Sequence, residues 1–505
     1  MRRRRVALAV AALSVPLASG IAVAGVSGGD VPAACYSATQ SAPDARAQLP
    51  CKFVQGTTNQ AGAYCRVADD ADDNCAVADG RDISDAELAA YEKSWTARAL
   101  SLQNNLETYA PFLEEQLPHT HNSFNSSAYD VPTDGSLPSY YPTLTNQDPN
   151  QVYSLTEQMD MGVRAIELDL HWVPSPYGSP ATNGFWVTLC HGDGQQVPGQ
   201  SDYVHVGCSD DRPAQDGFAE VRAWLDHHPD QFLLVYLENQ LYPEEPVASQ
   251  EQAHDIAASL LQQAFGSLVY KPQGVSPGNC ATLPYNASEQ QLMATGARVL
   301  LVGNCGPGAW SQWVFQRGDI WDESGQPSSY SAADCTRDEQ LRRSDTSFRR
   351  EFEDSTFVSA ATGSPTPAVT AAQVATMVRC GVNIIGLDQL QPQDGRLAAL
   401  VWSWAQGEPA SDGCAYFGAD NRFHADTCSS RRAAACQLDA NTWKLTRKAV
   451  PWSRAASECQ KEYAAPFAVP MNGFRSTQLA TAAGGQQAWL NYAGSGNSWV
   501  PGGPA

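Results

Sequence analysis

The stretch that most constrains this chain is residues 162–172, whose sequence is GVRAIELDLHW. Its apolar and polar residues alternate, which is typical of a β-strand with one face in a core. Ile166 and Leu168 share one face, and Glu167 and Asp169 project together from the other. Two adjacent carboxylates repel each other unless a positive charge lies between them, and Ca²⁺ is a hard cation that takes such oxygen ligands. The alternative is a strand with a solvated polar face.

The amino-terminal end predicts a secretory signal at residues 1–24. Residues 2–5 are four arginines, an apolar stretch follows, and residues 22–24 (AVA) fit a small-residue cleavage site. We therefore expect a secreted, extracellular protein. The formal net charge of −22 argues against a nucleic-acid partner, because nucleic acids favour basic surfaces.

An exported chain with 14 cysteines is expected to form disulfides. The sequence contains no tight CxxC pattern, so no zinc site is predicted. The pairing cannot be derived from the sequence, but local pairs are favoured, such as Cys190 with Cys208 and Cys280 with Cys305.

Composition and spacing divide the chain into segments. They are a signal peptide (1–24), a cysteine-rich segment (25–83), a large α/β domain (84–409), a cysteine-containing module (412–493) and a flexible tail (494–505). Strands and helices alternate in the large domain, which predicts a (β/α)₈-type barrel or a doubly wound sheet. The last module reads as a small α+β unit.

Several elements are predicted from local signals. Capping boxes at Ser84 and Ser154 predict helices over residues 84–109 and 154–162, and Gly162 suits a helix end. The highly charged residues 334–354 also look helical, with one solvated side. Further helices are expected around residues 218–225, 250–265 and 370–379, and further strands at residues 185–192, 232–239, 298–303 and 382–387.

Polar residues capable of catalysis stand at or near the ends of the predicted strands. They are His121, Glu167, Asp169, His191, Glu238 and Asp388. In a barrel, the carboxyl ends of the strands meet at one face, where active sites lie. Carboxylates that hold a cation, together with two histidines, suit phosphodiester cleavage. Each histidine by itself could equally be a hydrogen-bonded interior residue.

Four sequence segments carry a resemblance to a known family. They are residues 117–123 (LPHTHNS), 162–169 (GVRAIELD), 189–192 (LCHG) and 235–239 (VYLEN). In order and strand position they resemble the X region of Ca²⁺-dependent phosphoinositide-specific phospholipase C. The resemblance implies an irregular TIM barrel. Separately, the composition of the cysteine-rich segment predicts a disulfide-rich amino-terminal cap.

The resemblance also implies the residues of the site. His121 and His191 would be the catalytic pair, and Asn122, Glu167, Asp169 and Glu238 would bind Ca²⁺. His121 would stabilise the phosphoryl charge, and His191 would protonate the leaving oxygen.

Some features depart from the family or go beyond it. In the metal-independent bacterial type an arginine replaces the metal, whereas Asn122 and the Glu167-Asp169 strand favour the metal here. His119 stands where the family usually has a small residue and would crowd the loop. Arg164 is expected to face away from the site and to have no substrate role. No basic residues for extra inositol phosphates are evident, which favours plain phosphatidylinositol.

The predicted function is a secreted Ca²⁺-dependent phosphodiesterase. It would act as a monomer on a phospholipid at a membrane surface, releasing diacylglycerol and a cyclic inositol phosphate. One alternative is another substrate, such as a glycerophosphodiester. Another is a catalytically silent surface-binding or glycan-binding protein, because residues 452–459 and 487–492 weakly resemble C-type lectin-like domains. A disulfide-stabilised packing module explains those residues equally well.

Overall fold

The computed structural model describes residues 85–129, 150–175, 177–196, 203–206, 212–242, 250–317, 321–323, 348–354 and 369–502. The predicted signal peptide and cysteine-rich segment therefore lie outside the described residues. Among the helices in these ranges, none has both the length and the apolar character needed to cross a membrane.

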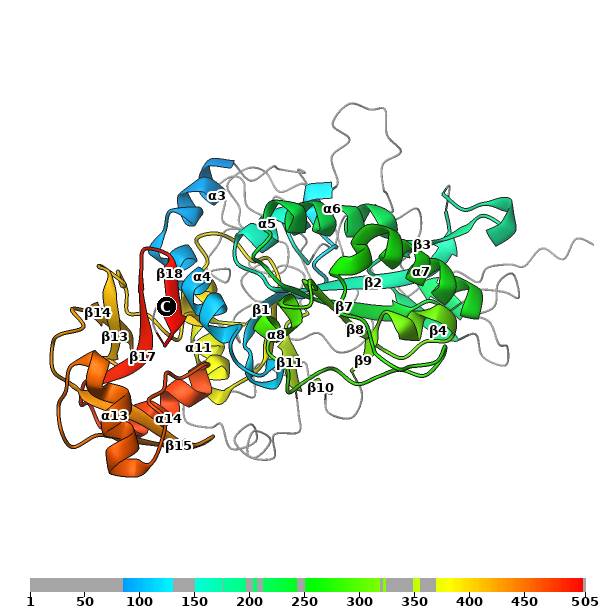
Figure 1. Cartoon of the computed structure of the whole chain (residues 1–505). Helices are drawn as coiled ribbons and strands as arrows, with labels where there is room; N and C mark the ends of the chain where they lie inside the picture. The colour runs from blue at the N-terminus through cyan, green and yellow to red at the C-terminus, as the bar shows by residue number, and fades with distance from the viewer. Residues whose placement is uncertain are drawn as a thin grey trace, which may run out of the picture.

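Eight parallel strands form most of the main sheet, which has ten strands in the described part of the chain, and they follow the same order in space as along the chain (Figure 1). They are β1 (Leu117–Thr120), β2 (Ala165–Pro174), β7 (Leu233–Gln240), β8 (Val299–Gly303), β9 (Phe315–Gln316), β10 (Trp321–Glu323), β11 (Phe348–Phe352) and β12 (Ile384–Leu387). The last strand pairs with the first, so the sheet curls round on itself. In the described part of the chain, no pairing joins β9 to β10, which leaves one seam. The predicted irregular (β/α)₈-type barrel is confirmed, because a doubly wound sheet would not close in this order.

The strand β2 has the two faces that its sequence predicts. Leu168 and Leu170 are fully buried in the large hydrophobic core, which includes residues of α6 (Ala214–His227). Burying each of these side chains contributes roughly 2 kcal/mol of transfer free energy. Glu167 and Asp169 alternate with them and lie on the opposite face, inside the barrel.

Local capping signals define several helices. In α5 (Leu155–Asp160) the predicted capping box forms between Ser154 and Glu157, and Gly162 follows with a φ of 98°. The helix therefore leads directly into β2. Other helices are α7 (Gln250–Phe265), α8 (Glu289–Met293), α11 (Ala371–Cys380) and α12 (Gly395–Leu400).

Two helix predictions are wrong, at least in part. The single helix expected over residues 84–109 is divided into α3 (Asp85–Glu92) and α4 (Trp95–Glu107). The break occurs because the Ser94 side chain accepts a hydrogen bond from the Ala97 N–H and begins a new helix.

The second error concerns the charged stretch. Residues 348–352 form β11, between β10 and β12, rather than the end of a helix. Arg349 and Glu351 form a buried ion pair. These two residues therefore do not need the solvated helix face that the many charges of this stretch suggested.

The strand that carries His191 is not one of the parallel barrel strands. β3 (Phe185–Leu189) runs antiparallel to β2, with Leu189 opposite Leu170. β2 extends beyond the barrel, and β3 folds back along this extension. His191 therefore returns to the carboxyl end of the barrel from a hairpin. The remaining short strands of this region are β4 (Asp193–Gln196), β5 (Tyr203–Val206) and β6 (Arg212–Pro213).

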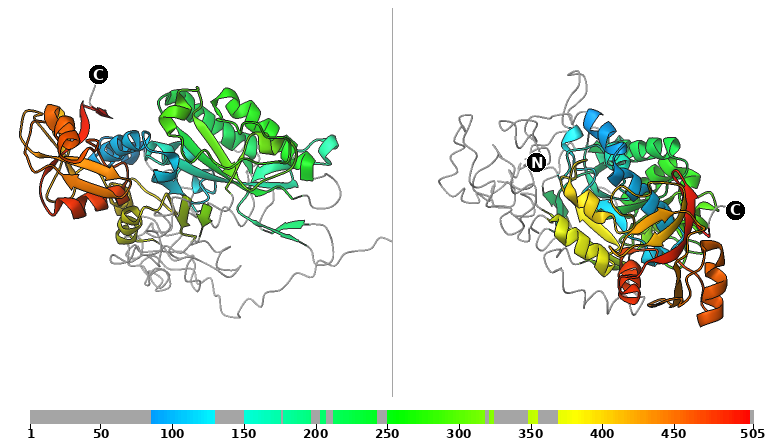
Figure 2. Two further views of the ribbon diagram at one scale, coloured as in Figure 1. Left: turned by 60° about the horizontal axis from the view of Figure 1, so that its bottom comes forward. Right: turned by 90° about the vertical axis from the view of Figure 1, so that its left-hand side faces the viewer.

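The carboxy-terminal part forms a second sheet with two helices. Its strands are β13 (Gly413–Phe417), β14 (Phe423–Asp426), β15 (Ala433–Asp439), β16 (Thr442–Leu445), β17 (Ala488–Ser495) and β18 (Ser498–Pro501), and its helices are α13 (Trp452–Tyr463) and α14 (Gly473–Ala483). Figures 1 and 2 show α4 between this sheet and the barrel. The Tyr492 hydroxyl donates to the Leu102 carbonyl at 3.2 Å, and Arg475 pairs with Glu114 just before β1. The module thus packs at the amino-terminal end of the barrel, away from the carboxyl ends of the strands.

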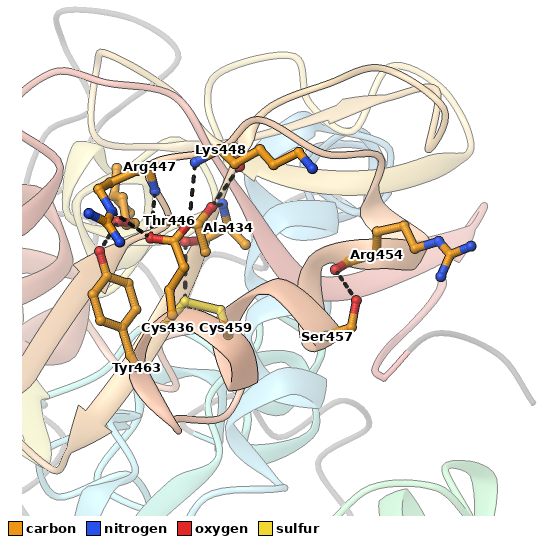
Figure 3. The surroundings of a disulfide bond; sticks show 11 residues. Ala434, Cys436, Thr446, Arg447, Lys448, Arg454, Ser457, Cys459 and Tyr463 are labelled. Atoms are coloured by element: carbon orange, nitrogen blue, oxygen red, sulfur yellow. Dashed lines mark hydrogen bonds and ion pairs between the residues drawn. A yellow bond between two sulfur atoms is a disulfide. The ribbon is translucent and has the colours of Figure 1, made fainter.

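Three disulfides lie within the described residues. The predicted pair Cys280–Cys305 is confirmed. Cys414–Cys428 joins the ends of the β13–β14 hairpin, and Cys436–Cys459 joins β15 to α13 (Figure 3). Cys208 lies outside the described residues, so its pairing with Cys190 stays a prediction.

Candidate active site at the carboxyl ends of the barrel strands

Strands β2 and β7 bring three acidic side chains together. Asp169 lies beside Glu238 in the parallel register, and Glu167 precedes Asp169 by two residues. One carboxylate oxygen from each residue lies within 4.8 Å of the other two. Burial, and then the negative charges of Glu238 and Glu167, raise the pKa of Asp169 well above its usual value. A cation between these groups would remove the repulsion.

Asn122 lies next to this cluster. It follows β1 with a left-handed φ of 44°, and its backbone N–H donates to Glu167 Oε2 at 3.0 Å. In the described part of the chain, Asn122 Oδ1 and Asp169 Oδ1 are buried and have no hydrogen-bond partner. A buried polar atom left unsatisfied costs about 1–3 kcal/mol. The four predicted ligands, Asn122, Glu167, Asp169 and Glu238, therefore form an oxygen-rich set that fits a hard cation such as Ca²⁺.

Arg350 of β11 enters this site without having been predicted. Its side chain is 2% exposed, and its guanidinium forms an ion pair with Glu167. It also lies over the rings of Tyr236 and Phe352, at 4.8 and 4.4 Å from their centroids. One guanidinium balances only one of the three carboxylates, so an excess of negative charge remains for a divalent cation. The alternation of Phe348, Arg350 and Phe352 is the sequence signal that would have revealed an inward-facing strand.

His121 lies between two carboxylates. Its Nδ1 is 3.3 Å from Asp388 Oδ1, and its Nε2 is 4.0 Å from Glu167 Oε2. Burial disfavours the charged imidazole, but Glu167 and Asp388 outweigh this effect and raise the pKa of His121 to about 9. The ring also stacks on Phe352 at 4.8 Å. His121 is therefore an imidazolium at neutral pH.

His191 has the opposite electrostatic character. Its Nδ1 lies 3.0 Å from Nδ2 of Asn125, and no carboxylate is within ion-pair distance among the described residues. Burial lowers the pKa of His191 to about 4. The two predicted catalytic histidines thus share one site, but one is charged and the other neutral.

His119 lies deeper in the barrel than His121. Its Nε2 is 3.9 Å from Glu167 Oε2, and burial, followed by the charge of Arg350, lowers its pKa well below the usual value. A Cβ atom at Gly386 would lie 2.8 Å from His119 Nδ1. The absence of a side chain at Gly386 therefore provides the space for His119. The sequence predicted that His119 would crowd the loop, but its side chain is accommodated inside the barrel.

Comparisons with known proteins identify the family of this chain. Residues 77–394 match the family model described as the Rv2075c PI-PLC-like domain. Two curated relatives from Mycobacterium tuberculosis, the uncharacterized protein MT2135 (strain CDC 1551) and the uncharacterized protein Rv2075c (strain H37Rv), are each 34% identical over 462 residues. The alignment covers 88% of this chain and 89% of each relative.

Solved structures of phosphatidylinositol-specific phospholipase C are more distant. The enzyme from Listeria monocytogenes gives a TM-score of 0.33 at 11% identity, over 59% of this chain and 98% of that enzyme. A variant of the Staphylococcus aureus enzyme gives 0.35 at 11% identity, over 60% and 98%. Similarity at this level does not define a substrate. The family match ends at residue 394, and the lectin-like resemblance of the carboxy-terminal module has no support.

Proposed function

This chain belongs to the family of the Rv2075c PI-PLC-like domain, and we propose that it is a secreted, Ca²⁺-dependent phosphodiesterase that cleaves phosphatidylinositol. The observation that carries the proposal is the convergence of three carboxylates, two of them buried, with Asn122 and two histidines at one end of the barrel. The products would be diacylglycerol and a cyclic inositol phosphate, which water can open in a second step.

Asn122, Glu167, Asp169 and Glu238 would hold the cation. A bound Ca²⁺ would supply positive charge to the phosphoryl oxygens and lower the pKa of the attacking hydroxyl. Glu167 or Glu238 would accept the proton of the inositol 2-hydroxyl, whose oxygen attacks phosphorus as the bond from phosphorus to the glycerol oxygen breaks. That oxygen takes a proton from a histidine and leaves as diacylglycerol.

The charges of the two histidines bear on which of them gives this proton. The pKa of His121 is raised to about 9, so it holds a proton to donate, whereas the lowered pKa of His191 keeps that ring neutral. We therefore assign proton donation to His121 and a hydrogen bond to the phosphoryl oxygens to His191. This reverses the division of roles expected from the sequence, and a comparison of leaving groups distinguishes the two.

The substrate and its setting follow from the same reasoning. No basic residues for extra inositol phosphates are evident in the sequence. This favours phosphatidylinositol over its polyphosphorylated forms. The predicted signal peptide supports export, and the monomeric state remains part of the proposal.

A substrate panel tests the proposal. The mature protein is assayed with phosphatidylinositol, phosphatidylcholine and glycerophosphoinositol, with Ca²⁺ or with a strong chelator. We expect cleavage of phosphatidylinositol only with Ca²⁺. Cleavage of glycerophosphoinositol but not of phosphatidylinositol would support the proposed phosphodiester cleavage and replace the proposed substrate. No cleavage of any diester in Ca²⁺ would overturn the enzymatic proposal and favour a surface-binding protein.

A further inference from the structure

Asn150 lies between the two histidines, although no motif singled it out. Its side chain is fully buried. Its Nδ2 donates to Asp388 Oδ1 at 3.1 Å, and its Oδ1 accepts from Asn125 Nδ2 at 2.8 Å and from Asn122 Nδ2 at 3.2 Å. One amide therefore contacts the carboxylate partner of His121, the amide partner of His191 and a proposed ligand of the cation.

The backbone holds Asn150 in place. The Gln389 N–H donates to the Asn150 carbonyl at 2.7 Å. The adjacent Gln151 donates from Nε2 to the carbonyls of His121 and Leu387, at 2.7 and 2.8 Å. The segment is thus tied to the ends of β1 and β12, and the Asn150 side chain has a defined position.

The direction of each hydrogen bond follows from one group that only accepts. Asp388 pairs with His121 Nδ1, and in its carboxylate form it only accepts hydrogen bonds, so the NH₂ group of Asn150 faces it. The Asn150 oxygen then faces Asn122 and Asn125, and both must present their own NH₂ groups to it. The orientations of three amides are therefore set by one carboxylate.

Two consequences reach the site. Because Asn122 gives its NH₂ group to Asn150, its oxygen is left to face away, and this is the buried atom without a hydrogen-bond partner. Because Asn125 presents NH₂ to His191 Nδ1, that nitrogen must accept, and the proton of the neutral ring lies on Nε2.

We propose that Asn150 is a positioning residue. Its NH₂ group faces the accepting carboxylate of Asp388, and its oxygen therefore sets the orientation of the Asn122 amide and, through Asn125, the tautomer of His191. It holds the Asn122 oxygen toward the cation site and His191 in the Nε2–H tautomer. The effect on turnover rests on the proposed function, but the tautomer of His191 does not.

The first test is Asn150→Leu, which keeps a similar volume and removes every hydrogen bond of the amide. Imidazole ¹⁵N chemical shifts, measured on protein labelled at histidine, distinguish a protonated nitrogen from an unprotonated one. In the wild type we expect His191 Nδ1 to be unprotonated and Nε2 protonated. Asn150→Leu should yield a mixture of tautomers. It should also lower kcat/KM and Ca²⁺ affinity by about 10–100-fold, as changes beside metal ligands do.

Asn383→Leu is the matched control. Asn383 is also fully buried, and its amide donates to the carbonyls of Leu113 and Glu115, both at 2.8 Å, and accepts from the Arg349 N–H. It lies at the opposite end of the barrel strands. Its loss should lower the melting temperature without changing the His191 shifts. An unchanged His191 signal in Asn150→Leu, or a protonated Nδ1 in the wild type, would overturn the proposal.

A second variant covers the case in which Asn150→Leu does not fold. In the double variant Asn150→Asp with Asp388→Asn, the new carboxylate accepts from Asn122, Asn125 and the new amide, so the same amide orientations are required. We expect His191 to keep the Nε2–H tautomer. Loss of the Nε2–H tautomer in this variant would contradict the proposed chain of hydrogen bonds from Asp388 to His191. An inactive wild type with the expected His191 shifts would count against the enzymatic proposal alone.

Discussion

The barrel buries two acidic clusters, one at each end, and they differ in what surrounds them. At the carboxyl ends of the strands, Glu167 and its neighbours face one arginine and two histidines. At the amino-terminal end, beneath α4, Glu107, Glu115 and Glu289 line a small cavity together with Arg164. Asp230 also lines the basal cavity. Both clusters therefore combine several carboxylates with one guanidinium, so composition alone does not distinguish them.

The partners of the basal carboxylates are structural. Glu107 accepts from the Trp402 indole at 2.6 Å and from the Gln116 backbone N–H at 2.9 Å, which ties α4 to the start of β1. Burial, and then the negative charge of Glu289, raise the pKa of Glu115 well above its usual value. Burial raises the pKa of Glu107 to about 8 and that of Glu289 to about 7.

The difference shows how a buried carboxylate is used in each place. At the base, protons and N–H groups neutralise the acids while α4 packs over them. At the other end, unpartnered oxygens and histidines of opposite charge surround the acids. Unsatisfied oxygens occur at both ends, because both carboxylate oxygens of Glu115 also lack a hydrogen-bond partner in the described part of the chain. The cluster with catalytic potential is thus recognised by its titratable histidine neighbours.

The largest expected effect separates the two histidines by leaving group. If His121 donates the proton, His121→Ala should lower kcat/KM on phosphatidylinositol by about 10²–10⁴-fold, and by much less on an inositol phosphodiester with a nitrophenol leaving group. A leaving group of low pKa departs without a proton. His191→Ala should harm both substrates to a similar degree.

The control is His228→Ala, whose ring stacks on Trp224 near the base of the barrel. It should change both rates equally and slightly. A leaving-group-dependent loss at His191→Ala, with equal losses at His121→Ala, would restore the roles expected from the sequence.

The next effect contrasts single acids from the two clusters. Asp169→Asn removes a proposed cation ligand, and we expect kcat/KM to fall by at least about 100-fold, with partial recovery in excess Ca²⁺. Glu289→Gln, at the base, should leave kcat/KM within about twofold. Initial rates across a Ca²⁺ titration measure both. Full wild-type activity in a strong chelator would eliminate the metal from the proposal.

The smallest effect concerns stability and pH. Folded Glu289 and Glu107 keep their protons up to pH values of about 7 and 8, whereas the usual value is 4.5. The folded state then binds more protons than the unfolded state, so stability is greatest at low pH and falls as pH rises from about 5 to 8. Glu289→Gln cannot ionise and should be roughly 1–3 kcal/mol more stable than the wild type at pH 8, with little difference at pH 5.

Urea unfolding at several pH values, in chelator, measures this difference. Glu92→Gln, on the exposed surface of α3, is the control and should follow the wild type. If the free energy of unfolding changed with pH in the same way for Glu289→Gln and the wild type, Glu289 would not carry a proton in the folded protein.

The carboxylate pair on β2 and the helix ends could be predicted because their signals are local. Alternation over residues 165–170 defines the two faces of β2, and the Ser154 capping box needs only its own turn. The motif residues His121, Asn122 and His191 could be identified in the same way. The helix predicted from charge over residues 334–354 is wrong at residues 348–352, which pair as a strand with β12 and carry a buried Arg349–Glu351 ion pair. Residues 334–347 lie outside the described residues.

By itself, the sequence determined which residues we propose for the chemistry and which face of β2 pairs two carboxylates. Only the tertiary structure decided their surroundings. The register of β2 against β7 places Asp169 beside Glu238, closure of the sheet brings Arg350 to Glu167, and Asn150 joins the two histidines. These contacts link residues far apart in the chain, and their energies depend on burial and on partners. Burial and these partners exist only after the strands of the barrel have assembled.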